Sequence, residues 1–313
     1  MLSYLIRRIG LAVVVLFGLL VATFFIIHLV PGDPVQIVLA GRATPEQIAH
    51  VRHQLALDRP LLDQFGVYVS HVFQGDFGTS FTLDSPVGEL IGQRVGPSAA
   101  LIAYGMLISL VIGIPLAIVA ALRPNGWRDN ATRVGTTLTF AMPRFWLGLM
   151  LALIFGLKLG WFPVSGYSGG IDGILRTLTL PALALGLGLS TVVVRTLRSS
   201  LLEVLQSEYI EAARSRGLSE LRVVGKHALR NSFMNTLTIL SVNIGFLIGG
   251  TVVLEQTFQI PGLGSLLVEA VGKRDYQLVQ ALALLAGAAV VLASLTADII
   301  QAFLDPRVRL GGR

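Results

Sequence analysis

Residues 97–122 read PSAALIAYGMLISLVIGIPLAIVAAL, a run of 26 residues without a charged side chain. An α-helix rises 1.5 Å per residue, so about 20 apolar residues cross the hydrocarbon core of a bilayer. A buried helix of a soluble protein rarely stays uncharged on every face over this length. The stretch therefore predicts a membrane span.

The same pattern recurs along the chain. Five further apolar segments carry at most one charge each: residues 9–30, 134–157, 178–194, 231–254 and 278–304. Of the 313 residues, 53% are hydrophobic and 13% are charged, against about 25% charged in a soluble domain. This composition excludes a soluble domain and a disordered chain. We expect an all-α, polytopic membrane protein with six transmembrane helices, the first retained because its apolar run exceeds that of a signal peptide.

The basic residues divide unevenly between the two sides of the predicted membrane. With six spans both termini lie on one side, and the segments on that side hold 15 of the 24 Lys and Arg in 64 residues. The other side holds 8 in 109 residues. Because Lys and Arg concentrate in cytoplasmic loops, we expect both termini and the 195–230 loop in the cytoplasm. The net charge of +6 is then a topology signal, and nucleic acid is not an expected partner.

The most informative loop is residues 209–220, which read YIEAARSRGLSE. Gly217 suits the left-handed position that ends a helix, and Ser219 suits the N-cap of the next one. The pattern predicts a helix, a sharp glycine corner and a short second helix. Small side chains at Ala212 and Ala213 would let another surface approach closely. The residues alone leave open whether this is a docking knob or an ordinary interfacial loop.

This loop resembles a known motif. The E-A-A-x-x-x-G pattern is similar to the EAA loop in the membrane subunits of binding-protein-dependent ABC importers. The whole chain resembles the B-type permease subunit of dipeptide and oligopeptide importers. Further segments match in the order and spacing of that family: LVPGDP (29–34), GDFGTS (75–80), PRFWLG (143–148), GWFPVSG (160–166), RSSL (198–201), HALRN (227–231), IPGLG (260–264), RDY (274–276) and DPR (305–307).

The resemblance implies a type I ABC importer permease fold in a prokaryotic inner membrane. It also implies four kinds of partner: lipid, a second homologous permease subunit in a heterodimer, two ATPase subunits, and an extracytoplasmic substrate-binding protein. The chain itself would be no enzyme and would hold no cofactor, since ATP and Mg bind to the ATPase subunits. It has no G-x-x-x-x-G-K-[ST] phosphate loop.

The resemblance further implies which residues couple transport to ATP hydrolysis. They are Glu211, Ala212, Ala213 and Gly217. Position alone adds Arg214, Arg216 and Leu218 to this set.

We expect four parts along the chain. Residues 1–30 form an N-terminal segment with the first transmembrane helix, and residues 31–96 form an extracytoplasmic loop region. A five-helix permease core at 97–304 carries the coupling loop at 199–230, and a cytoplasmic tail follows at 305–313. Within the outer loop, Thr44, Pro45 and Gln47 predict a helix start.

Four polar residues are candidates for the translocation pathway: Arg144, Asn243 and Asp298 in predicted spans, and Glu255 at the outer end of the fifth span. An arginine at the bilayer centre costs about 2.5–3.5 kcal/mol or more, so Arg144 should face a cavity, a partner helix or a counter-ion. It stands where the family usually has a small or apolar residue. It either binds an anionic group of the solute or pairs with a carboxylate. For Asp298 we favour pairing with a basic residue.

The expected substrates are di- or oligopeptides delivered by the binding protein. Nickel chelates, glutathione and opines are alternatives within the same family. A stand-alone secondary transporter is a further alternative, although the sequence lacks the internal repeats typical of that class. His50 and His53 have a helical spacing, but no third ligand accompanies them, so we expect no metal site.

Overall fold

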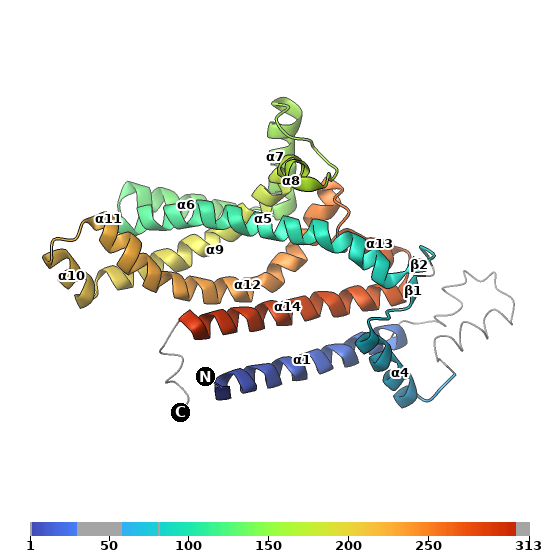
Figure 1. Cartoon of the computed structure of the whole chain (residues 1–313). Helices are drawn as coiled ribbons and strands as arrows, with labels where there is room; N and C mark the ends of the chain where they lie inside the picture. The colour runs from blue at the N-terminus through green and yellow to red at the C-terminus, as the bar shows by residue number, and fades with distance from the viewer. Residues whose placement is uncertain (1, 30–57, 81, 305–313) are drawn as a thin grey trace. The chain divides into compact units, whose positions relative to one another are not determined.

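The computed structural model describes residues 2–29, 58–80 and 82–304 (Figure 1). In these residues the chain is helical apart from its loops and one short antiparallel ribbon, β1 (Thr79–Ser80) and β2 (Ser85–Pro86). The chain forms two compact units, which we call the core unit and the flanking unit. The core unit is centred on Ala99–Ile260, and the flanking unit comprises Ile6–Ser98 and Pro261–Leu292.

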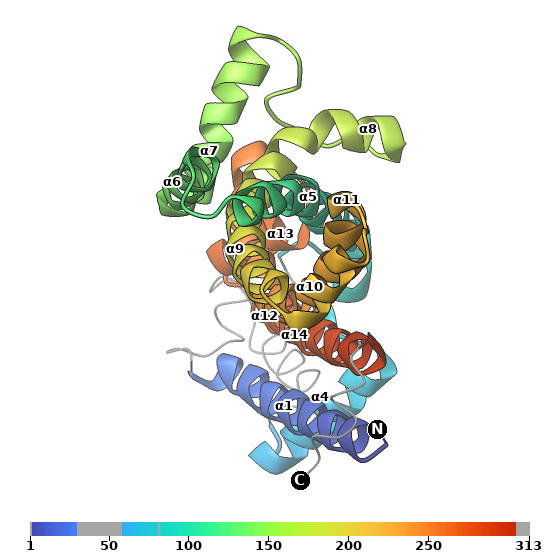
Figure 2. The same ribbon diagram turned by 90° about the vertical axis from the view of Figure 1, so that its left-hand side faces the viewer.

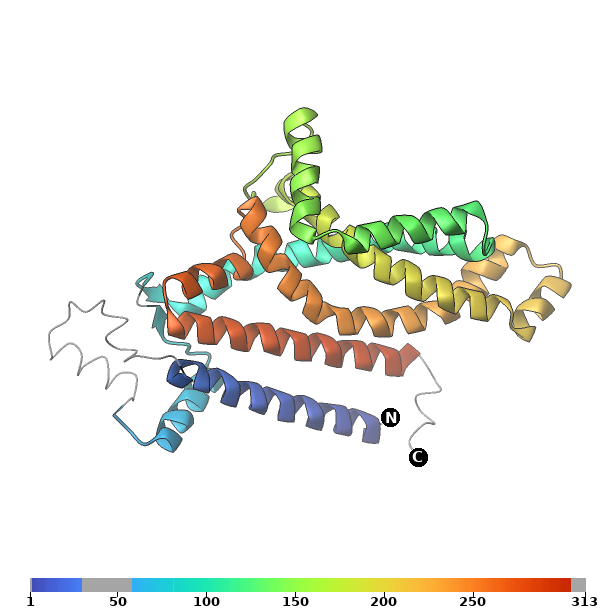
Figure 3. The same ribbon diagram turned by 180° about the vertical axis from the view of Figure 1, so that it is seen from behind.

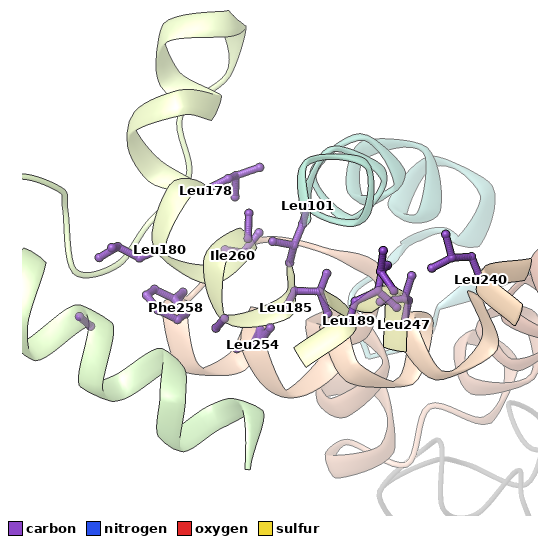
Figure 4. Close-up of a cluster of buried hydrophobic side chains, with 14 residues drawn as sticks. Leu101, Leu178, Leu180, Leu185, Leu189, Leu240, Leu247, Leu254, Phe258 and Ile260 are labelled. Atoms are coloured by element: carbon purple, nitrogen blue, oxygen red, sulfur yellow. The ribbon is translucent and has the colours of Figure 1, made fainter. Parts of the chain in front are cut away.

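The core unit is built on α5 (Val87–Leu122), α9 (Thr179–Leu205) and α12 (Leu229–Phe258), which lie side by side in Figures 1 and 2. The helix α9 is buried along most of its length. Figure 4 shows the cluster that joins the three helices. In it, Leu185 and Leu189 of α9 meet Leu101 of α5 and Leu247 of α12. Apolar side chains thus fill the space between helices that were predicted separately as spans.

Small residues let α5 and α9 approach closely. A Cβ at Gly186 would overlap the backbone oxygen of Gly105 and the side chain of Ile108. A Cβ at Gly113 would in turn overlap the side chain of Val193. Close contact at small residues is a common way for helices to associate in membranes.

The predicted third span, residues 134–157, is not one continuous helix. The chain forms α6 (Trp127–Ala141), then α7 (Arg144–Leu151), then the π-helix η1 (Ala152–Lys158). The helices on either side of Met142 and Pro143 are bent by 103°. Met142 is extended, which is the conformation that a following proline favours. Arg144 begins the second helix of this bent pair, and its position in the middle of a span stays a prediction.

After α6 and α7, the core unit has a short helix in a loop and an elbow. The loop helix is α8 (Gly170–Thr177), which precedes α9. The elbow joins α9 to α12 through α10 (Glu208–Ser215), α11 (Glu220–Arg222) and the π-helix η2 (Val223–Ala228). This order of helix, corner and short helix confirms the prediction for residues 209–220.

The flanking unit contains α1 (Leu2–Leu29), α4 (Leu61–Gln74), α13 (Leu263–Gly272) and most of α14 (Tyr276–Leu304). Figure 3 shows α1 running beside α14, and a Cβ at Gly287 of α14 would overlap the side chain of Leu19. The Thr23 hydroxyl lies 3.0 Å from the Tyr68 hydroxyl, which ties α1 to α4. We did not expect α4. The helix predicted from Thr44 to residue 57 lies outside the described residues.

Among the described residues, four helices are long and apolar enough to cross a membrane by themselves: Ile6–Phe25 within α1, α5, α9, and Tyr276–Ile299 within α14. The broken pair of α6 with α7 and η1 meets the same criteria only when taken together. The helix α12, which holds the predicted fifth span, is 30 residues long. These helices confirm an all-α polytopic membrane protein, and the count of six spans stays a prediction.

Candidate functional site

The elbow turns at Gly217. Gly217 has φ +77°, in the left-handed region, and a pair of reversed hydrogen bonds closes the end of α10. The N–H of Leu218 donates to the carbonyl of Ala213 at 3.3 Å, and the N–H of Gly217 donates to that of Arg214 at 2.9 Å. This is the Schellman arrangement, in which a glycine reverses the chain without steric cost. It confirms the helix end that the sequence predicted.

An apolar base holds the elbow in place. Ile210 and Ala213 of α10 are buried against Val223 of η2 and Leu201 of α9, and Leu218 packs against the same cluster. The short helix α10 alone would be marginal, since isolated helices below about 12 residues are unstable in water. Its position is therefore set by this cluster.

Two polar contacts brace the elbow from outside. The Arg214 guanidinium donates to both carboxylate oxygens of Glu220, at 2.7 and 3.3 Å, across the Gly217 corner. The Asn231 side chain donates to the Tyr209 hydroxyl at 2.8 Å, which connects α10 to the start of α12. Ser219 occupies the predicted N-cap position of α11, but its side chain makes no capping hydrogen bond.

The predicted coupling residues divide into two groups. Ala213, Leu218 and Gly217 shape the corner and its base, and Arg214 is paired with Glu220. Glu211, Ala212 and Arg216 are exposed. Leu221, which the sequence reasoning missed, is 88% exposed at the same elbow. We call Glu211, Ala212, Arg216 and Leu221 the candidate docking residues.

A buried ion pair fixes α6 to α9 on the elbow's side of the core unit. The Arg198 guanidinium donates to both oxygens of Asp129, each at 2.6 Å, and the backbone N–H of Asn125 donates to Asp129 at 2.9 Å. Asp129 is fully buried. Two parallel charge-assisted hydrogen bonds give a strongly directional contact, so the part of α9 around Arg198 is held firmly against α6.

A cavity of about 590 Å³ opens in the core unit between the α6–α7 bend, α9 and α12. Its lining includes two of the four candidate pathway residues, Arg144 and Asn243. It also includes Arg195 of α9, which the sequence reasoning had treated only as part of the cytoplasmic charge. Threonines and apolar side chains complete the wall: Thr139, Thr191, Thr196, Phe140, Met142, Leu189, Val192 and Leu247, with Gly188.

Arg144 lies against two glycines at the cavity, and at one of them it fills the space of the missing side chain. A Cβ at Gly250 of α12 would overlap the Nη1 atom of Arg144, and one at Gly188 of α9 would lie 3.6 Å from its Nε atom. The neighbouring Gly249 has open space where its Cβ would be. The guanidinium thus lies between α9 and α12, in contact with Gly188 and in the space where a side chain at Gly250 would begin.

Comparison with known proteins identifies the family. Residues 113–310 match the family described as binding-protein-dependent transport system inner membrane component, and residues 1–100 match the N-terminal part of that component. The chain belongs to this family. It is therefore a permease subunit of a binding-protein-dependent ABC importer, and not itself an enzyme, as the resemblance implied.

Relatives match this permease over nearly its full length. It is 40% identical over 312 residues to the glutathione transport system permease protein GsiC of Salmonella choleraesuis, covering 99% of each chain. It is 37% identical over 312 residues, again 99% of each, to a peptide transport system permease protein of Brucella abortus. An inward-facing structure of the MetNI methionine ABC transporter has a similar fold, with a TM-score of 0.59 at 17% identity over 69% of this chain and 96% of that one.

The other two candidate pathway residues of the permease lie away from the cavity. Glu255 is buried near the end of α12, and its backbone carbonyl accepts a hydrogen bond from Ile260 at 2.8 Å. Asp298 is half-buried on α14. The structure brings together Arg144 and Asn243, but it does not place Glu255 or Asp298 on the same cavity wall. Their roles stay predictions.

The flanking unit holds one polar centre that the sequence reasoning missed. Asp275 is buried and accepts hydrogen bonds from the hydroxyls of Ser80 and Thr82, at 2.5 and 2.7 Å. It also accepts from the backbone N–H of Leu278 at 3.2 Å, which caps α14. Two family-like segments, 75–80 and 274–276, are joined by this carboxylate. Because its partners are about 195 residues away in sequence, no local pattern indicated the contact.

Proposed function

We propose that this permease imports peptides or closely related solutes, glutathione included, and is driven by ATPase subunits that bind its candidate docking residues. The observation that carries the proposal is the position of the elbow. It joins α9 to α12, and these same two helices line the cavity that contains Arg144. A movement of the elbow is thereby transmitted to the cavity wall.

The elbow has the stiffness that such a lever needs. Its corner is closed by backbone hydrogen bonds, its base is apolar and buried, and the ion pair of Asp129 with Arg198 holds α9 next to it. Meanwhile Ala212 and Leu221 expose small and apolar surface to a partner. Alternating access through rigid-body movement requires this combination of an internally rigid element and a free contact surface.

The complete importer in this proposal has four further components. A second homologous permease completes the pathway as a heterodimer, two ATPase subunits bind ATP and Mg, and a substrate-binding protein delivers the solute outside. The excess of Lys and Arg in the 195–230 loop supports a cytoplasmic elbow, with both termini on that side of the inner membrane. The relatives named for glutathione and peptide transport support the substrate class.

Purification of the tagged permease from its native membrane in a mild detergent tests the proposal. We expect a second permease and ATPase subunits to co-purify. Together with its binding protein, the complex should take up dipeptides or glutathione into liposomes only when ATP is present on the side of the membrane where the ATPases lie. A chain that purifies alone and still transports would contradict the proposal. So would a complex that takes up no peptide in the presence of ATP.

A further inference from the structure

Two arginines give the cavity of the core unit a positive wall. Arg144 and Arg195 both line it, and no acidic residue is among the described residues of the lining. Arg195 lies seven residues beyond Gly188 on α9, which is two helical turns or about 10 Å. Since Gly188 lies against Arg144, the two arginines line the same cavity at positions separated along the axis of α9.

The remaining polar groups of the wall offer hydrogen-bond acceptors. The Asn243 side-chain N–H donates to the Ile239 carbonyl at 2.7 Å, which leaves its oxygen as an acceptor. The hydroxyls of Thr139 and Thr196 also donate to their own helices, to Gly135 and Val192, both at 2.9 Å. Their lone pairs stay available. The wall therefore combines cationic donors with neutral acceptors.

We propose that this cavity is a transit site for a carboxylate-bearing solute, with the carboxylate at Arg144 and Arg195 and the N–H groups of the solute at Asn243, Thr139 and Thr196. The proposal rests on the proposed function and adds a chemical preference within the permease itself, separate from that of the binding protein. A guanidinium is suited to this task because its planar donors match a carboxylate in pairs.

The glycines beside Arg144 provide a way to move the charge without removing it. Gly250→Ala adds a Cβ where the Nη1 atom of Arg144 now lies, whereas Gly249→Ala adds one in open space. The two variants differ by one position on the same helix and carry the same added methyl group. A requirement for a correctly seated guanidinium predicts that only Gly250→Ala impairs the site.

The test measures ATP-driven uptake by the reconstituted complex, with its binding protein, of Ala-Ala and of Ala-Ala amide, which has the same shape but lacks the carboxylate. The uptake ratio of the two is compared between variants, so the constant preference of the binding protein cancels. We expect Arg144→Gln, Arg195→Gln and Gly250→Ala to lower the ratio of Ala-Ala uptake to Ala-Ala amide uptake about tenfold, the size of one charge-assisted hydrogen bond. Arg144→Lys should retain part of the preference.

Gly249→Ala and Arg133→Gln, an exposed arginine on α6, serve as controls and should leave the ratio unchanged. If Gly250→Ala lowers the amount of protein in the membrane, adding Arg144→Gln should restore it, because the overlap is with that side chain. An unchanged ratio in Arg144→Gln and Arg195→Gln, with both peptides affected equally, would overturn the transit site while leaving the importer intact. Absence of ATP-driven uptake of any peptide by the unaltered complex would overturn the proposed function, and the site with it.

Discussion

Two helix ends in the permease have the same backbone conformation but different surroundings. At Gly217 in the core unit and at Arg274 in the flanking unit, a residue in the left-handed region closes a helix, with φ +77° and +56°. Around Arg274, the N–H of Asp275 donates to the Ala270 carbonyl at 2.8 Å, and that of Arg274 donates to the Val271 carbonyl at 3.1 Å. The hydrogen-bond pattern is the one found at Gly217.

The two corners differ in what surrounds the turn. After Arg274 comes Asp275, a buried carboxylate whose acceptor positions are used by Ser80, Thr82 and Leu278 within the same unit. After Gly217 comes Leu218, which joins an apolar base and leaves the outer surface of the elbow exposed. The first corner is therefore an internal clamp, whereas the second leaves an exposed surface, as the proposed binding of the ATPase subunits requires.

The largest predicted effect is at the internal clamp. Asp275→Ala removes the shared acceptor of Ser80, Thr82 and the first turn of α14, and should lower the free energy of unfolding by about 3 kcal/mol or more, because buried donors lose a charged partner. Thermal denaturation in detergent and the amount of protein in the membrane measure this. Asp275→Asn should lose less, and Asp63→Ala, at an exposed position on α4, should change little. A stable Asp275→Ala variant would mean that the clamp is dispensable.

The next effect concerns the elbow corner. No atom lies within 4 Å of a Cβ built at Gly217, so substitution there acts through backbone strain alone. Gly217→Val should cost about 1–2 kcal/mol in that conformation and uncouple ATP hydrolysis from uptake, whereas Gly217→Asn, which tolerates a left-handed backbone, should retain most coupling. ATP hydrolysed per peptide imported is the measurement. Equal behaviour of the two variants would show that the left-handed backbone at residue 217 is not needed to couple ATP hydrolysis to uptake.

The smallest effect distinguishes the two corners by their left-handed residue. Arg274 has a side chain in a conformation that favours glycine, so Arg274→Gly should relieve strain and raise thermal stability by up to about 1 kcal/mol. Uptake should stay unchanged if this corner has only a structural role. A loss of uptake at unaltered stability would assign Arg274 a part in transport and weaken the contrast with Gly217.

Local sequence signals predicted much of this architecture. Long uncharged runs located α5, α9 and α14, and the spacing of Gly217 and Ser219 indicated the corner, because spans and caps depend on neighbouring residues. Hydropathy did not reveal the bend before Arg144, because residues 134–141 of α6 carry no charge and run directly into the apolar helix α7. Pro143 was the signal that could have indicated it.

Long-range contacts could not be read in this way. Asp275 finds its partners nearly two hundred residues away, and the space for the Arg144 guanidinium is left by Gly250 on another helix. A glycine in an apolar helix predicts close packing without saying which side chain fills the space. The grouping of Arg144, Arg195 and Asn243 on one cavity therefore required the three-dimensional structure.

Ala212 and Ala213 offer the most direct test of the coupling elbow, because they are adjacent, and one is exposed while the other is buried in the base. The measurement is the amount of ATPase that co-purifies with Ala212→Arg, compared with the unaltered permease and with the thermal stability of each. We expect Ala212→Arg to lose the ATPase subunits at unchanged stability, whereas Ala213→Arg should destabilise the permease. Full retention of the ATPase subunits by Ala212→Arg would contradict the docking role of the elbow.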